Sequence, residues 1–115
     1  MAKSSGSIFA ALIVLSAAVS GTAHAAIDAD AAKALAKAND CLKCHALDKT
    51  KKGPSLKAIA AKYQGKADGP EKGLKNITVA HTVKLEDGTE EEHKTIDSKD
   101  IGALKNLVAW ILSQK

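Results

Sequence analysis

Hydrophobic residues recur at helical spacing in three stretches of the chain. Over residues 29–40, Leu35 shares one face with several alanines, and acidic residues suited to a helix N-terminus precede the run. A second run follows Ser55, a favourable N-cap, and stops at Gly65. In the third run, residues 99–114, bulky apolar side chains recur after Asp97 or Ser98 as the cap. These patterns predict amphipathic helices and a mainly α fold.

Between residues 77 and 95 the period of the pattern changes to two. Apolar or histidine side chains alternate with polar ones at Val79, His81, Val83 and Leu85. The Asp-Gly pair at 87–88 is a strong hairpin signal, so this segment predicts a β-hairpin with those four side chains on one face. Residues 66–76 contain glycines, a proline and charges, and they predict a turn followed by a short helical turn.

The first 25 residues have the order of a secretory signal peptide. Lys3 supplies a positive charge, residues 8–20 are apolar, and Ala23 and Ala25 suit a cleavage site. The apolar run of 13 residues is shorter than the roughly 20 needed to span a bilayer. We therefore expect cleavage after Ala25, a single mature domain at residues 26–115 without a transmembrane segment, and a periplasmic location.

Composition indicates that the mature chain needs help to form a core. It has two aromatic residues, Tyr63 and Trp110, much of its apolar content is alanine, and the only methionine of the sequence is Met1. Small domains of this kind often need a cofactor or a cross-link. All basic residues are lysines, 16 in the mature part against 13 acids, without arginine or stacking aromatics among them. This pattern argues against nucleic-acid binding.

The stretch CLKCH at residues 41–45 is the candidate chemical site. A zinc site needs four ligands, but no other cysteine exists and the two remaining mature histidines are 12 positions apart. A redox dithiol would be expected in a βαβ context, and a disulfide here would close a very small loop and stabilise little. C-x-x-C-H is the motif of c-type haem attachment. We therefore predict that Cys41, Cys44 and His45 hold one covalent haem c, with His45 as a ligand of its iron.

Around this motif the chain resembles the small bacterial class I cytochromes c. The similarity comprises residues 30–65, including the motif and "GPSLKAIAAKY", and the final "LVAWILSQK". The resemblance implies a helical fold around one haem with crossing terminal helices, to which the hairpin near residues 77–95 would be an insertion. It also implies that a carbonyl of Gly53 or Pro54 accepts a hydrogen bond from His45 Nδ1. The implied function is electron transfer between periplasmic redox proteins, without enzyme activity.

The chain departs from that family at the second axial ligand. Where family members carry a methionine ahead of the tryptophan, this chain has His93 and Lys94. Position favours His93, whereas the alternating pattern favours His81; Lys94 would have to lose a proton to bind iron, and an open iron is the fourth alternative. The length of the hairpin loop decides whether His81 and His93 lie on the same face of the hairpin. A two-residue loop would turn His93 away from His81, and a three-residue loop with a bulge would place both on one face.

The second ligand separates two functions. His45 with His93 predicts a bis-histidine electron carrier of lower potential than its methionine-ligated relatives. A displaceable or absent sixth ligand instead predicts a haem-based gas-binding or sensor protein. Exposed lysines close to the motif would steer an acidic redox partner towards the haem. These are Lys43, Lys49, Lys51, Lys52 and Lys57.

Overall fold

The elements of the fold are helices with one small hairpin, as the sequence predicts. The computed structural model describes residues 26–115; the expected signal peptide, residues 1–25, lies outside this range. In chain order the elements are α1 (Ala29–Ala38), α2 (Cys41–Cys44), α3 (Leu56–Tyr63), α4 (Gly69–Thr78), β1 (Thr82–Lys84), β2 (Glu90–Glu92) and α5 (Ile101–Leu112). Within residues 26–115, none of these helices has the length and apolar character to cross a membrane.

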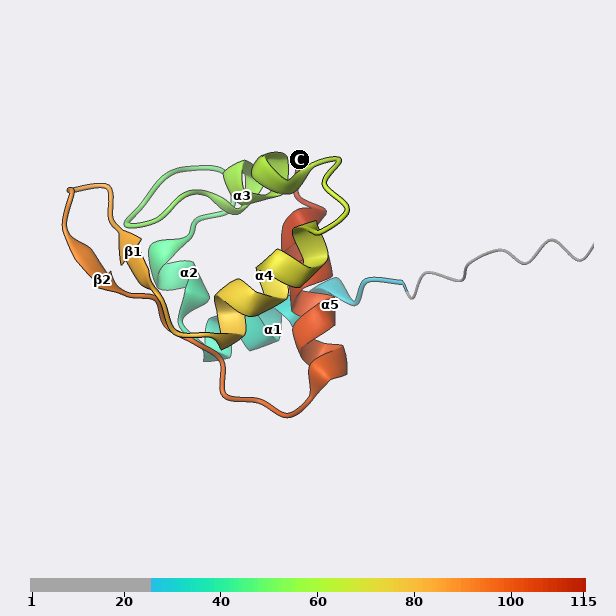
Figure 1. The fold of residues 1–115 in the computed structure, drawn as a ribbon. Helices are drawn as coiled ribbons and strands as arrows, with labels where there is room; N and C mark the ends of the chain where they lie inside the picture. Colours follow the sequence, from blue (N-terminus) through green and yellow to red (C-terminus); the bar gives the residue numbers. More distant parts are fainter. Residues whose placement is uncertain (1–25) are drawn as a thin grey trace, which may run out of the picture.

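The first and last helices pack against each other on the side of the molecule away from the hairpin (Figure 1). The Asp28 side chain caps α1 by accepting a hydrogen bond from the backbone N–H of Ala31 at 2.9 Å. Asp28 also bonds to α5 in both directions: its backbone N–H donates to Asn106 Oδ1 at 2.9 Å, and Asn106 Nδ2 donates to its carbonyl at 2.8 Å. The start of α1 is thereby fixed to the middle of α5.

Helix α1 ends two residues before the predicted limit of residue 40. Asp40 adopts a left-handed conformation, with φ 57°, which a helix cannot continue through. The chain therefore turns at Asp40, and the short helix α2 that carries the cysteines begins in a new direction. At the other end of the chain, Asp100 caps α5 by accepting from Ala103 N at 2.9 Å, so the predicted caps Asp97 and Ser98 were wrong.

The core lies between α1, α3, α5 and the segment before α5. Its buried members are Ala32, Ala36, Leu56, Ile96, Leu104, Leu107 and Trp110. The two small alanines belong to α1, and they leave room for α5 to approach closely. Two residues that the pattern places on apolar faces are instead exposed: Ile101 at 51% and Val79 at 48%. Both stand at the end of a helix, where the regular face no longer meets the core.

Helix α4 is longer than the short helical turn that the sequence predicts after a turn in residues 66–76. It has ten residues, and Pro70 lies in its first turn, where proline needs no hydrogen-bond partner. Gly73 allows α4 to pack closely on α5, because a Cβ at this position would lie 2.7 Å from Val108 Cγ1. Ile77 and Thr78, expected in the hairpin, are the last residues of this helix.

The hairpin forms with shorter strands than predicted, and its register settles the question of faces. Thr82 pairs with Glu92, and Leu85 N donates to the Thr89 carbonyl at 2.7 Å, so the loop is the three-residue alternative, 86–88. Gly88 in this loop has φ 85°. One step beyond the paired strands, His93 N donates to the His81 carbonyl at 2.8 Å. The two histidines therefore stand directly opposite each other and on the same face.

Candidate functional site

The residues singled out in the sequence surround one cavity of about 750 Å³. This volume lies within the range of about 300–1,000 Å³ typical of small-molecule and cofactor sites. Cys41, Cys44 and His45 line it from one side, and the hairpin contributes His81 and His93. Apolar side chains from the hairpin and three helices complete the wall, among them Val83, Leu85, Ile59, Ile77, Val108 and Ile111.

The hairpin closes one side of this cavity. Its loop is bonded to the segment that follows the CLKCH motif, because Glu86 N donates to the Lys52 carbonyl at 3.2 Å. In Figure 1 the hairpin stands beside α2 and the 46–55 segment, away from the crossing of α1 and α5. The inserted hairpin is thus a wall of the site.

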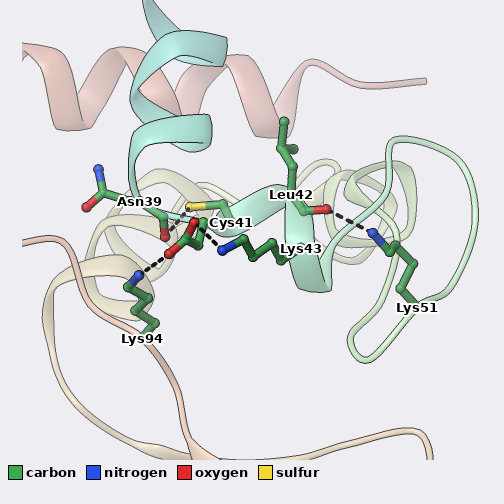
Figure 2. Close-up of polar contacts among 7 residues, drawn as sticks. Asn39, Cys41, Leu42, Lys43, Lys51 and Lys94 are labelled. Atoms are coloured by element: carbon green, nitrogen blue, oxygen red, sulfur yellow. Dashed lines mark hydrogen bonds and ion pairs between the residues drawn. The ribbon is translucent and has the colours of Figure 1, made fainter.

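Helix α2 places the two thiols on the same side. Cys41 and Cys44 are three residues apart in one helical turn, so their side chains are neighbours on its surface. Both thiols are free and half-buried. Burial raises the pKa of the Cys41 thiol above its usual value, and Cys41 Sγ lies 3.9 Å from the Asn39 carbonyl, which accepts from it (Figure 2). Two adjacent thiols at the edge of an apolar cavity fit the attachment of a macrocycle through two thioether bonds.

The His45 ring is held by the loop after the motif. Its Nδ1 lies 2.7 Å from the Pro54 carbonyl. A carbonyl only accepts, so Nδ1 carries the proton and the lone pair of Nε2 remains for a metal. Gly53 lies against the ring, and a Cβ at that position would be 2.8 Å from His45 Cε1. This contact confirms the bond that the resemblance implied and assigns it to Pro54. Such a bond fixes a ligand ring and increases its basicity.

His93 faces His45 at a spacing suited to one metal between them. The two ring centres are 6.2 Å apart, and the planes are inclined by 49°. With metal–nitrogen bonds of about 2.0–2.1 Å, and nitrogens about 1.1 Å from each ring centre, two opposed imidazoles on one metal have centres roughly 6.3 Å apart. The observed distance agrees with this value, so the spacing of the two rings is compatible with a haem iron between them.

The surroundings of His93 favour the neutral form of its ring. Its pKa is lowered, mainly by burial and then by the neighbouring His81 and His45. The backbone groups of Lys94 and Asn76 oppose this shift to a smaller extent. Within residues 26–115, however, the buried Nδ1 of His93 has no hydrogen-bond partner of normal geometry. A neutral imidazole is the form that binds a metal.

His81 contacts His93 and has a different environment. The two rings are stacked, with centres 4.9 Å apart and planes inclined by 21°. Nδ1 of His81 donates to the Val79 carbonyl at 2.8 Å. In the described part of the chain His81 forms no ring pair with His45, whereas His93 does. The structure therefore brings both predicted histidines into the cavity but places only His93 opposite His45.

Lys94 is directed to the corner between α1 and α2. Its Nζ lies 2.7 Å from Asp40 Oδ2, and Lys43 Nζ lies 2.9 Å from the other oxygen of the same carboxylate (Figure 2). These two lysines, Lys94 first, hold the pKa of Asp40 at about 2. The ammonium group of Lys94 is thus engaged at the surface, with its side chain 62% exposed. This position does not support the alternative of Lys94 as an iron ligand.

Two features of the site were missed from the sequence. Asn76 Nδ2 donates to the Tyr63 hydroxyl at 3.0 Å on the cavity wall. This pair was missed because residues 66–76 were assigned to a turn, although Asp68 and Pro70 are a recognisable helix start. The bond between Asp40 and Lys94 joins residues 54 positions apart, and no local pattern indicates it.

Comparison with known proteins places this geometry in a family. The family model described as cytochrome c matches residues 29–115. The crystal structure of the class 1 cytochrome MtoD from Sideroxydans lithotrophicus ES-1 is 53% identical and superposes with a TM-score of 0.75, over 77% of this chain and 98% of that one. Wild-type cytochrome c552 of Nitrosomonas europaea is 31% identical, with a TM-score of 0.59, over 72% of this chain and 99% of that one.

A curated relative matches over a shorter stretch. Cytochrome c-552 of Nitrosomonas europaea is 49% identical over 45 residues, which are 39% of this chain and 40% of that protein. The alignment therefore spans less than half of that relative. The two structural superpositions, in contrast, cover almost the whole of the chains they match.

Proposed function

Because the chain belongs to the cytochrome c family, whose members bind haem c covalently, we propose that it is an exported single-haem electron carrier and not an enzyme. Cys41 and Cys44 attach the haem to α2. His45 and His93 would hold its iron. When bound, the haem supplies an iron that alternates between the ferric and ferrous states.

The observation that carries the ligand assignment is the 6.2 Å spacing of the His45 and His93 rings across the cavity. It agrees with the sequence, in which residues 26–115 contain no methionine. A second imidazole is a stronger donor than a thioether and favours ferric iron. The protein is therefore expected to have a lower potential than methionine-ligated members of its family.

The chain's own residues prepare the site for electron transfer in three ways. His45 and His93 would hold the iron together, which would leave the metal no free position for a substrate. The apolar residues of the wall, with Val83 and Leu85 from the hairpin, lower the polarity around the ring pair. The bond from His45 to Pro54 fixes one ring, and the bond from the hairpin loop to Lys52 joins the hairpin to the segment after the motif. A site whose geometry changes little between oxidation states exchanges electrons with little reorganisation.

Export and partners complete the proposal. Residues 1–25 have the composition of a signal peptide, which supports a periplasmic location and redox partners in that compartment. Sequencing the N-terminus of protein purified from the periplasmic fraction tests this point. The expected first residue is Ala26. Recovery of the intact chain in the cytoplasmic fraction would contradict export.

Substitution of His93 tests the ligand assignment. The wild-type holoprotein should show low-spin optical and EPR spectra, without the far-red band of sulfur ligation, and should bind CO slowly when reduced. His93→Ala should convert the ferric haem to high spin and give rapid CO binding, because the distal position is vacated. His81→Ala is the matched control, since it removes the neighbouring imidazole, and it should remain low-spin.

Other results would overturn the assignment in defined ways. If His81→Ala becomes high-spin while His93→Ala does not, the two histidines have exchanged roles. If the wild-type protein is already high-spin, or binds CO rapidly, the gas-binding function predicted as the alternative replaces electron transfer.

A further inference from the structure

We propose that His81 is a positioning residue that sets the orientation of the His93 ring in the haem site. The proposal rests on the proposed function only in that His93 is taken to bind the iron. His81 acts through His93 and has no bond to the metal. Its role follows from the different ways in which the two facing imidazoles are held.

The ring of His45 is fixed by a hydrogen bond. Nδ1 is bonded to the Pro54 carbonyl at 2.7 Å, and Gly53 packs directly against the ring. No bond of comparable geometry fixes His93, because among residues 26–115 its buried Nδ1 has no hydrogen-bond partner of normal geometry, and the backbone groups of Lys94 and Asn76 act on it only weakly. A ring without a bonded Nδ1 is free to turn about its Cβ–Cγ bond unless packing prevents it. Packing must therefore fix the orientation of the His93 ring, as a hydrogen bond fixes that of the His45 ring.

The ring of His81 supplies this packing. It is stacked on His93 with 4.9 Å between centres and 21° between planes. This spacing lies in the range of about 4.5–7 Å preferred by interacting aromatic pairs. Rotation of the His93 ring out of its present plane would bring it into collision with this neighbour or lose the stacking contact.

His81 is itself held in place, which makes it an effective support. Its Nδ1 donates to the Val79 carbonyl at 2.8 Å, next to the end of α4. Its carbonyl accepts from His93 N at 2.8 Å, so the two residues are cross-strand partners. The three-residue hairpin loop and the end of α4 thus determine where the His81 ring stands, and this ring determines the plane of His93.

The plane of an axial imidazole has measurable consequences. The ring planes of His45 and His93 are inclined by 49°, and with both rings on the iron this angle would govern how the ligand π orbitals mix with the iron d orbitals. That mixing sets the g values of low-spin ferric haem and contributes to the reduction potential. His81 is therefore a residue through which the hairpin sets the electronic properties of the site without ligating it.

EPR spectroscopy of the frozen ferric holoprotein tests the proposal with three variants. His81→Ala removes the ring, His81→Leu keeps bulk without a ring, and His81→Phe restores a flat ring that cannot bind iron. All three should remain low-spin. In the Ala and Leu variants the feature at the largest g value should shift and broaden, because the His93 ring samples several orientations. In the Phe variant it should return close to its wild-type position and width.

The matched control is Thr82→Ala, an exposed position next to His81 on the other face of the hairpin, and it should leave the spectrum unchanged. Redox titration of the same proteins should show a displaced potential in the Ala and Leu variants and recovery in the Phe variant. If Ala does not retain haem, the comparison of Leu with Phe decides the result.

Two outcomes would reject the positioning role. Unchanged g values and potential in the Ala and Leu variants would mean that His93 is oriented without His81. Failure of Phe to recover what Leu loses would mean that the planar ring is not what matters. Failure of the ligand assignment is seen separately, as a low-spin spectrum that persists in His93→Ala, and failure of the proposed function as a high-spin spectrum of the wild type.

Discussion

At the residue scale, the ring of His45 lies against backbone that has no room for another carbon atom. Gly53 is needed because the ring passes directly over it, with Cε1 and Nδ1 at 2.8 and 3.1 Å from the position a Cβ would take. The neighbouring Pro54 carbonyl accepts the hydrogen bond from Nδ1. The His45 ring can therefore take this orientation only if position 53 has no side chain.

Gly53→Ala should displace the His45 ring and weaken its bond to Pro54. Overpacking of this kind costs about 1–3 kcal/mol of unfolding free energy, to be measured by denaturant titration of the ferric holoprotein, and the reduction potential should change with it. Gly102→Ala is the control, since a Cβ there meets only Asp100 Oδ1 at 3.4 Å within α5. That helical substitution should stabilise by up to about 1 kcal/mol. Equal effects of both variants on potential would contradict the account of Gly53.

The carboxylate of Asp40 pairs with Lys43 of α2 and with Lys94 after the hairpin. Its contribution to the stability of the fold should depend on pH. Lys94 and Lys43 lower its folded-state pKa from 3.8 to about 2. A lowered pKa means that the folded state holds the carboxylate ionised more readily than the unfolded state. The stabilisation is therefore complete above pH 3.8 and is lost as pH falls towards 2.

Asp40→Asn isolates this charge, because asparagine tolerates the left-handed backbone of that position. The variant should unfold at slightly lower denaturant concentration than the wild type at pH 7, and the difference should disappear near pH 2. The effect should be small and reduced by salt, as for other exposed ion pairs. A difference that persists at low pH would assign the effect to packing of the side chain.

At the scale of elements, the hairpin is the piece that brings the second histidine to the cavity. The register of the hairpin depends on its three-residue loop. Gly88 in that loop has φ 85°, a backbone conformation that residues with a Cβ rarely adopt. A Cβ at Gly88 would meet no other atom, so any cost of substitution comes from the backbone alone.

Gly88→Ala should therefore destabilise the hairpin by roughly 1–2 kcal/mol, the cost of left-handed backbone for an ordinary residue. Since the hairpin carries His93, the rate of CO binding to the reduced protein should rise, because release of the ligand becomes more frequent. Gly88→Asn should behave more like the wild type, since asparagine adopts this conformation more readily. Identical CO kinetics in Ala and wild type would show that the hairpin loop does not control the distal ligand.

At the scale of the whole molecule, charge is distributed unevenly around the cavity. Exposed lysines occupy α2 and the segment after it, as the sequence predicts. The hairpin adds acids to the same side, and its loop is bonded to Lys52 through Glu86. These acids are Glu86, Asp87, Glu90, Glu91 and Glu92. Any charged partner that approaches this side therefore meets both signs.

Two small redox reagents of opposite charge show whether positive or negative residues dominate at the surface through which electrons leave the haem. If the lysines dominate, oxidation of the reduced protein by ferricyanide should slow as ionic strength rises, and oxidation by a cationic cobalt(III) complex should accelerate. The reason is screening, whose length falls to about 8 Å at 0.15 M salt. Lys49→Gln combined with Lys52→Gln should flatten both dependences, whereas Lys105→Gln on α5 is the control. The opposite pair of slopes would assign the exit to the acidic hairpin.

The core of the molecule shows why the fold and the cofactor belong together. The buried cluster consists mainly of leucine, alanine and one tryptophan, and it lies on the α1–α5 side. The half-buried apolar residues Ile59, Ile77 and Ile111 face the cavity as well. A macrocycle in that space supplies the bulky apolar group that the composition lacks.

The sequence by itself determined the local features of this protein. Three of the helices, the hairpin, the caps at Asp28 and Ser55, and the CLKCH motif all follow from residues close together in the chain. Local patterns suffice for such features, because capping, periodicity and turn chemistry act over a few residues. The same rules could have predicted helix α4. Gly73 argued against a helix there, because a glycine lowers helix propensity and its close contact with Val108 is visible only in the structure.

Only the tertiary structure decided which groups meet across the cavity. One residue more or less in the hairpin loop changes the face of His93, and the sequence allowed both alternatives. The register, the 6.2 Å spacing from His45 and the bond from Lys94 to Asp40 join residues 6 to 54 positions apart. Such contacts depend on how helices and hairpin pack, and no pattern within a few residues specifies them. The motif therefore fixed the near side of the site, and packing of the hairpin fixed the far side.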